Sequence, residues 1–170
     1  LHQSLGCTII FVTHDQMEAM TLATSIAVMN KGKIEQIAKP MEIYNNPKSL
    51  FVAKFVGSPQ MNIINSDKDE NLALCLSKKL NIEKNKVKNF GARPESIKMV
   101  QQNNGDINAK IETIQPTGAD WIVGLDVSGK SIFVISSEPP IGKENDIIGI
   151  DFKVEGCHSF DSNDLRIVKS

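Results

Sequence analysis

The chain has 170 residues, of which 41% are hydrophobic and 23% are charged, a balance that excludes wholesale disorder. Its formal net charge is −1, from 19 basic and 20 acidic residues, so the charge total predicts neither nucleic acid nor an acidic membrane surface as a partner. No apolar run is long enough for a transmembrane helix. The chain opens LHQSLG, without a signal peptide or an initiator Met, and we therefore expect its natural beginning to lie upstream.

Three cysteines, Cys7, Cys75 and Cys157, are odd in number and far apart. Together with the missing signal peptide, this predicts reduced thiols in a cytosolic setting instead of a disulfide framework. A zinc site needs clustered Cys and His, and the neighbours Cys157 and His158 have no second such pair in the sequence. We therefore expect no metal site.

The first third of the chain alternates between strand-like and helix-like segments. The β-branched run CTIIFVT (residues 7–13) predicts a buried strand, and good helix formers follow it. Two capping boxes are possible at the start of this helix, one from Thr13 to Gln16 and the other from Asp15 to Glu18.

The next segments predict a β-hairpin and two short helices. SIAVMN and KIEQIA (within residues 25–38) are predicted strands, joined by a turn in which Gly32 takes a positive φ. Pro40 and Pro47 are each well placed at the start of a helix. This order of elements is typical of the end of an α/β domain, to which we assign residues 1–57.

After Gly57 the pattern changes to short β-like runs separated by turn residues, with no helical period longer than two turns. A small all-β barrel or sandwich over residues 58–170 is therefore predicted. The β-like runs are NLALCL (71–76), KVKNFGA (86–92), DINAKIETI (106–114), DWIVGLDV (120–127), KSIFVIS (130–136), DIIGIDFKV (146–154) and DLRIVK (164–169).

The segment GLDVSGKS (residues 124–131) matches the phosphate-loop pattern G-x-x-x-x-G-K-[ST]. A working phosphate loop connects a strand to a helix whose N-terminus faces the anion. Here β-like runs precede and follow the pattern, and no helix follows Lys130. We therefore predict a hairpin turn, with Gly129 supplying the permissive dihedral, Gly124 marking a bulge or bend, and Lys130 solvated.

His14 follows a predicted buried strand and precedes a helix, which is the edge where α/β sheets bind ligands. A neutral imidazole there can donate to a phosphate oxygen or hold an attacking water. The residues alone also allow a helix-start histidine without a role, and both interpretations stay open at this point.

Residues 8–62 resemble the C-terminal part of the ATP-binding subunit of ABC importers, most of all the branch that serves sugars and glycerol 3-phosphate. The resemblance rests on VTHDQ-EAM-LA, the KP-EIY--P run, FVA-F-GSP and MN. It implies that His14 is the switch histidine that contacts the ATP γ-phosphate. This catalytic and cofactor-binding role would exist only in the intact dimer.

The same resemblance implies an α/β C-terminal remnant of an ABC nucleotide-binding domain, followed by an all-β OB-like (TOBE) regulatory barrel over residues 58–170. FGARPES and CHSFD resemble the G-x-R-P-E and H-x-F-D segments of that domain. Arg93 and Glu95 could form a ligand site, but a structural ion pair is favoured because no polar groups converge on them in the sequence. His158 is expected to order a loop.

For the intact protein, the resemblance implies ATP and Mg²⁺ as cofactors, and as partners a second ATPase subunit, membrane permease subunits and a possible regulatory protein. It implies a cytoplasmic protein, peripheral on the inner face of the plasma membrane. Apart from the false match, this chain contains no phosphate loop, no Leu-Ser-Gly-Gly-Gln signature and no catalytic Glu. We therefore expect no ATPase activity and no bound cofactor for the chain alone.

An alternative from another class is a stand-alone OB-like module that binds a small oxyanion, a saccharide or an oligonucleotide. Residues 58–170 are net acidic and hold few aromatic residues. A nucleic-acid stacking surface would interleave aromatic residues with Lys or Arg, so we expect no nucleic acid as partner.

Overall fold

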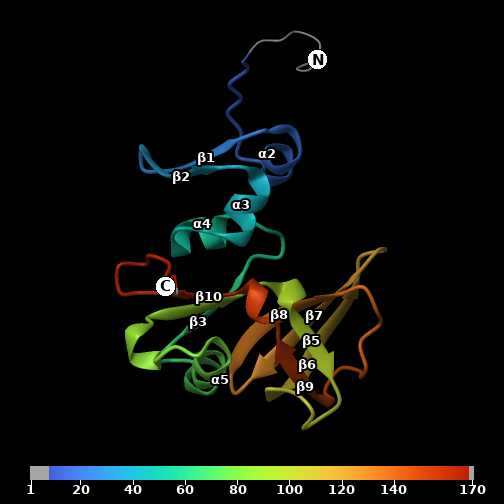
Figure 1. The fold of residues 1–170 in the computed structure, drawn as a ribbon. Helices are drawn as coiled ribbons and strands as arrows, with labels where there is room; N and C mark the ends of the chain where they lie inside the picture. Colours follow the sequence, from blue (N-terminus) through green and yellow to red (C-terminus); the bar gives the residue numbers. More distant parts are fainter. Residues whose placement is uncertain (1–7, 169–170) are drawn as a thin grey trace.

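The computed structural model describes residues 8–168. Figure 1 shows a helical part with a β-hairpin stacked on a larger, mainly β part. The elements of the helical part are α2 (Gln16–Leu22), β1 (Ile26–Asn30), β2 (Lys33–Ala38), α3 (Pro40–Asn45) and α4 (Leu50–Phe55).

The local signals of this first part are largely confirmed. Asp15 is the N-cap of α2, because its carboxylate accepts hydrogen bonds from the backbone N–H groups of Met17 (2.8 Å) and Glu18 (3.2 Å). The antiparallel hairpin β1–β2 forms as predicted, and Gly32 has a φ of +78° in its turn. Helix α3 begins at Pro40, whereas α4 begins after the N-cap Ser49 and not at Pro47.

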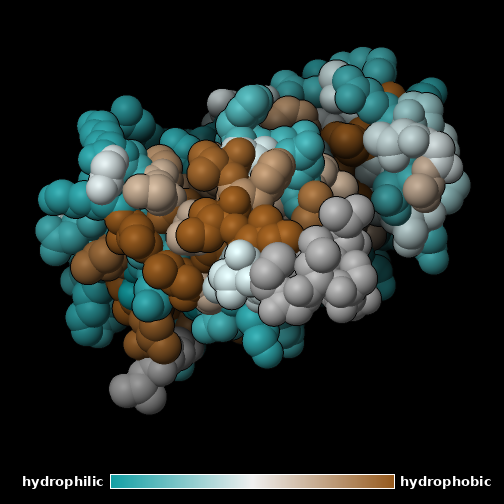
Figure 2. All heavy atoms as spheres, turned by 90° about the horizontal axis from the view of Figure 1, so that it is seen from above, coloured by the Kyte–Doolittle hydropathy of each residue, from teal (hydrophilic) through white to brown (hydrophobic). Residues whose placement is uncertain are grey.

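The prediction of a buried strand over residues 7–13 is wrong where the structure describes it, and Cys7 lies outside the described residues. Residues 8–13 have no β-ladder partner within residues 8–168, and Ile10 and Val12 are both 90% exposed. A β-branched run becomes a buried strand only where neighbouring strands pair with it and other elements cover its faces. Figure 2 shows apolar side chains gathered on this face of the molecule, seen from above.

The β part consists of two antiparallel sheets. The three-stranded sheet has the order β10 (Cys157–Phe160), β4 (Asn89–Ala92), β3 (Asn62–Asn65). The five-stranded sheet has the order β5 (Ile97–Val100), β9 (Ile147–Phe152), β6 (Ile107–Pro116), β7 (Trp121–Val127), β8 (Lys130–Ser136). Short 3₁₀ turns are η1 (Lys84–Lys86), η2 (Pro94–Ser96) and η3 (Val154–Gly156). The described strands of the β part therefore form two open sheets and not the closed barrel expected over residues 58–170.

The prediction of a strand is wrong for two of the β-like runs. The run NLALCL lies in a helix, α5 (Glu70–Leu80), whose residues Leu72, Ala73 and Leu76 are buried. Lys78 and Lys79 occupy its last turn, and Asn81 ends it in the left-handed conformation with a φ of +49°. The run DLRIVK forms no strand over its described residues, which make only the isolated bridges Ser49↔Leu165 and Phe160↔Arg166.

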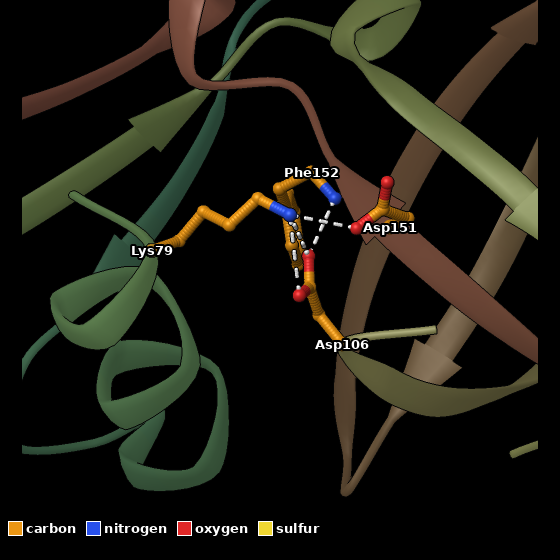
Figure 3. A network of polar contacts seen from close by, with 4 residues as sticks. All are labelled: Lys79, Asp106, Asp151 and Phe152. Atoms are coloured by element: carbon orange, nitrogen blue, oxygen red, sulfur yellow. Dashed lines mark hydrogen bonds and ion pairs between the residues drawn. The ribbon is translucent and has the colours of Figure 1, made fainter. Parts of the chain in front are cut away.

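One hydrophobic core joins α5 to both sheets. Ion pairs of Lys79, in the last turn of α5, also connect the helix to the five-stranded sheet. The ammonium group of Lys79 lies 2.7 Å from an Asp151 carboxylate oxygen and 3.0 Å from one of Asp106 (Figure 3). Asp106 also accepts a hydrogen bond of 2.8 Å from the backbone N–H of Phe152. Cys75 and Cys157, which pack in or against the same core, are free thiols as predicted. Within residues 8–168, no helix is both long and apolar enough to cross a membrane.

Candidate functional site

His14 lies exposed immediately before the N-cap of α2. The residue before it, Thr13, makes two hydrogen bonds to the start of α2. Its hydroxyl oxygen accepts from the backbone N–H of Asp15 at 2.9 Å, and its hydroxyl donates to the Glu18 carboxylate at 2.7 Å. The imidazole has no hydrogen-bond partner among the described residues. His14 thus lies just before a helix, as predicted, but the buried strand expected to precede it does not form over residues 8–13.

Arg93 lies in a different environment, fully buried with 2% of its surface exposed. Its guanidinium donates hydrogen bonds to the carbonyl oxygens of Tyr44 at 2.8 Å and of Ala53 at 3.2 Å, and to that of Val56. These carbonyl groups lie at the C-terminal ends of α3 and α4, where backbone acceptors lack partners within the helix. Arg93, from the β part, therefore caps two helices of the first part.

The expected Arg93–Glu95 ion pair does not form between these two side chains. Arg93 faces helix carbonyl groups and lies over the Tyr44 ring, with 4.0 Å from its central carbon to the ring centroid. Glu95 instead accepts a hydrogen bond of 2.6 Å from the Tyr44 hydroxyl. The backbone turns at η2, so the side chains of Arg93 and Glu95 do not meet. Both contact Tyr44, which lies 49 positions before Arg93: Arg93 through the Tyr44 carbonyl oxygen and Glu95 through its hydroxyl.

Burial sets the electrostatics of this junction. Desolvation, followed by the hydrogen bond to Glu95, raises the pKa of Tyr44 to about 12. Desolvation also lowers the pKa of Arg93 from its ordinary value. Sequence reasoning missed Tyr44 as a member of this group, and its place in the KP-EIY--P run was the only available signal.

His158 lies in strand β10 and is 3% exposed, so the prediction that it orders a loop is wrong. Both ring nitrogens lack a hydrogen-bond partner within the described part of the chain. Desolvation, with smaller effects of Arg166 and Arg93, lowers the pKa of His158 to about 4, so the ring is neutral at pH 7.

GLDVSGKS forms the predicted hairpin, with β7 and β8 joined by a two-residue turn. Both turn residues have positive φ, +55° at Ser128 and +87° at Gly129, as in a type I′ turn. The predicted bulge lies in the neighbouring strand β6 and not at Gly124 itself. Gly124 pairs with Thr113 of β6, and its lack of a Cβ leaves room for Thr113 Oγ1. Lys130 is not simply solvated, because its ammonium group lies 3.4 Å from the Asp69 carboxylate.

The candidate residues thus occupy two places: His14 lies at the start of α2, and Arg93 and Glu95 lie at the junction with Tyr44. A hydrogen bond of 3.0 Å from the backbone N–H of Gly57 to Gln16 connects α2 with the chain segment held by Arg93. No cluster of potential metal ligands occurs among residues 8–168.

No family model matches the chain. Curated relatives do match it: the ABC transporter ATP-binding protein YcjV of Escherichia coli O6:H1 is 37% identical over 95% of this chain and 48% of its own length. The sn-glycerol-3-phosphate import ATP-binding protein UgpC of Pectobacterium atrosepticum is 38% identical over 95% of this chain and 48% of its own. UgpC 1 of Rhizobium johnstonii is 36% identical over 100% of this chain and 49% of its own.

The chain is therefore a homologue of the ATP-binding proteins of ABC transporters, a group that includes sn-glycerol-3-phosphate import proteins. It spans about half the length of these relatives and corresponds to their C-terminal part.

Proposed function

We propose that the chain is the C-terminal portion of the ATP-hydrolysing subunit of an ABC importer. Residues 1–57 belong to the ATPase domain, and residues 58–170 form a regulatory domain of the OB-like TOBE type. The observation that carries this proposal is the match along 95–100% of the chain, at 36–38% identity, to one half of ABC ATP-binding proteins.

The exposed apolar surface of the first part supports the proposal. Large apolar side chains are exposed along residues 8–13 and on the hairpin, including Ile10, Val12, Met29 and Ile37. Water-exposed apolar surface on strand-forming segments is typical of a face that another part of the protein covers. In the intact subunit, the upstream half of the ATPase domain would cover it and would pair with residues 8–13 as a strand.

His14 supplies the contact to the ATP γ-phosphate in this proposal. Its exposed imidazole can donate a hydrogen bond to a phosphate oxygen in the intact dimer. The upstream half would supply the phosphate loop, the Mg²⁺ ligands and the catalytic base. The chain alone is therefore inactive as an ATPase.

The proposed partners are a second copy of the ATPase subunit and the permease subunits, which place the protein at the cytoplasmic face of the membrane. Glycerol 3-phosphate or a related sugar is the proposed cargo, from the names of the UgpC relatives. The β part would tune assembly or meet a regulatory protein.

The test is His14→Ala in the intact subunit assembled with its permease. We expect retained ATP binding, with hydrolysis and transport lowered roughly 100-fold or more, because a charge-stabilising contact to the reacting phosphate is lost. Met17→Ala, at an exposed position in the helix that follows His14, is the matched control and should keep wild-type rates. Wild-type hydrolysis and transport in His14→Ala would assign no role to His14, and ATP turnover by the isolated chain would contradict the proposal itself.

A further inference from the structure

Gln16 is the second residue after His14 and the first residue of α2. Its side-chain oxygen accepts a hydrogen bond of 3.0 Å from the backbone N–H of Gly57, which follows α4. Among residues 8–168, this is the one hydrogen bond that ties residues 13–22 to another part of the chain. The bond therefore acts directly on the end of the helix beside which His14 lies.

Packing within the described residues constrains α2 only weakly. The helix has seven residues and none of them is buried, and Met17 and Leu22 are 70% and 72% exposed. Met20 packs, partly buried, against a small hydrophobic cluster of the first part. A helix of this length has little stability of its own in water. The Gln16–Gly57 contact therefore has a large share in fixing its orientation.

The Gly57 N–H is itself held in place from the β part. Arg93 donates to the carbonyl oxygen of Val56, one residue before Gly57. Gly57 lies between two side chains, since a Cβ on it would come within 3.1 Å of Arg93 Nη1 and of a Tyr44 ring carbon. In Figure 1, α3 and α4 lie between α2 and the β part. Arg93 thus fixes the donor to which Gln16 is bonded.

The position of His14 has to be precise for a contact to the ATP γ-phosphate. Such a contact stabilises the transition state only where the donor lies within hydrogen-bond distance of the oxygen that gains charge. A misplacement of about 1 Å can lower the rate roughly 100-fold. Because Gln16 and His14 lie at the same end of α2, a shift of this end away from Gly57 would displace His14 as well.

We infer that Gln16 is a positioning residue for His14, anchored to the β part through Gly57 and Arg93. The inference rests on the proposed function, in which His14 contacts the γ-phosphate. Gln16 acts by holding the start of α2 and not by touching the nucleotide. The β part therefore affects hydrolysis through the placement of His14, without contributing a group to the nucleotide site.

The test uses the intact subunit assembled with its permease. Gln16→Met removes the acceptor and keeps the length of the side chain. We expect kcat to fall roughly ten-fold while the KM for ATP stays within about two-fold, because a contact of the transition state is weakened and the binding contacts are kept. Gln16→Glu keeps an acceptor oxygen and should retain at least about half of the wild-type kcat. Met17→Gln, at the exposed neighbouring position, is the control and should keep wild-type kinetics.

Combination with His14→Ala separates positioning from a general loss of stability. If Gln16 acts through His14, Gln16→Met should lower the residual hydrolysis of His14→Ala by less than about two-fold. A merely structural role would lower hydrolysis by the same factor in both backgrounds. Arg93→Lys keeps the charge but not the planar group of donors, so it should lower kcat roughly five-fold alone and have little effect beside His14→Ala.

The outcomes distinguish this inference from the proposed function. Wild-type hydrolysis in His14→Ala contradicts the role of His14 and with it the positioning role of Gln16. An impaired His14→Ala beside a wild-type kcat in Gln16→Met overturns the positioning role alone, as does an equal loss from Gln16→Met in both backgrounds. A wild-type kcat in Arg93→Lys overturns the anchoring through the β part. Gln16→Leu, which also lacks an acceptor, decides if Gln16→Met fails to assemble.

Discussion

The side-chain oxygen of Gln16 accepts a hydrogen bond of 3.0 Å from the backbone N–H of Gly57. This contact joins the helix that begins just after His14 to the residue next to Val56, whose carbonyl oxygen Arg93 binds. Helix α2 and the β part are therefore connected through one short segment of backbone. Gly57 has a φ of +109°, a conformation that few other residues adopt, and a Cβ at this position would lie 3.1 Å from Arg93 Nη1, so a larger residue would strain this segment.

The first prediction concerns this contact. Gln16→Met removes the acceptor while keeping the length of the side chain, so the Gly57 N–H loses its partner. We expect the amide exchange of Gly57 to become roughly five-fold faster, which corresponds to about 1 kcal/mol. Hydrogen exchange read at Gly57 measures this directly. Met17→Gln, at the exposed neighbouring position, should leave the rate unchanged, and equal rates in both variants would show that the contact contributes nothing.

The second prediction concerns Arg93. Arg93→Met keeps much of the buried side-chain volume but leaves the carbonyl groups of Tyr44, Ala53 and Val56 without this donor. We expect the free energy of unfolding to fall by about 3 kcal/mol, measured by urea denaturation at pH 7. Arg166→Met is the comparison and should cost less than about 1 kcal/mol, because among the described residues the Arg166 guanidinium donates only to the exposed Asn46 side chain. Equal losses in the two variants would contradict the capping role.

The elements that were predicted correctly from the sequence are those set by residues adjacent in the chain. The hairpins β1–β2 and β7–β8 follow from period-two patterns on both sides of residues that allow positive φ, and Pro40 marks the start of α3 correctly. The same reasoning failed for α5, because Leu72, Leu74 and Leu76 alternate as in a strand. In the helix Leu74 is instead 43% exposed, whereas Leu72 and Leu76 are buried.

The role of Arg93 was beyond sequence reasoning because its partners lie far away in the chain. Tyr44, Ala53 and Val56 precede it by 49, 40 and 37 positions. Glu95, two positions away, was the partner that spacing suggested for Arg93. Its carboxylate instead accepts a hydrogen bond from the Tyr44 hydroxyl. Packing of the helical part on the β part decides these pairings, and no local pattern encodes it.

The third prediction concerns the network that holds α5. The hydrogen bond to Lys79 lowers the pKa of Asp151, and the hydrogen bond to Asp151 raises the pKa of Lys79. The Asp151 contribution is therefore present above its unfolded pKa, which is ordinarily about 4, and is lost as the pH falls through the lower folded value. Lys79→Met should cost roughly 1 kcal/mol at pH 7, since these groups are partly exposed, and less at pH 2.

Urea denaturation of wild type and Lys79→Met at both pH values checks this prediction. Lys86→Met is the matched control, because Lys86 pairs with Glu83 at the surface, where both side chains are 64% exposed. Exposed pairs of this kind contribute little, so the control should change the free energy of unfolding by less than about 0.5 kcal/mol. A loss for Lys79→Met no larger than this control, or one that does not shrink at low pH, would count against the network.

The fourth prediction concerns His158 and pH. Burial, with Arg166 and Arg93 nearby, lowers the pKa of His158 to about 4, against about 6.5 in the unfolded chain. Between these values the unfolded chain binds a proton that the folded protein does not, so stability falls as the pH drops from about 6.5 to 4. The loss should approach about 3 kcal/mol, since each pKa unit corresponds to about 1.4 kcal/mol. His158→Phe should remove this part of the pH dependence, whereas His14→Gln, at an exposed position, should retain it.

Thermal or urea denaturation across this range measures the effect, and an unchanged pH profile in His158→Phe would show that His158 is not the group responsible.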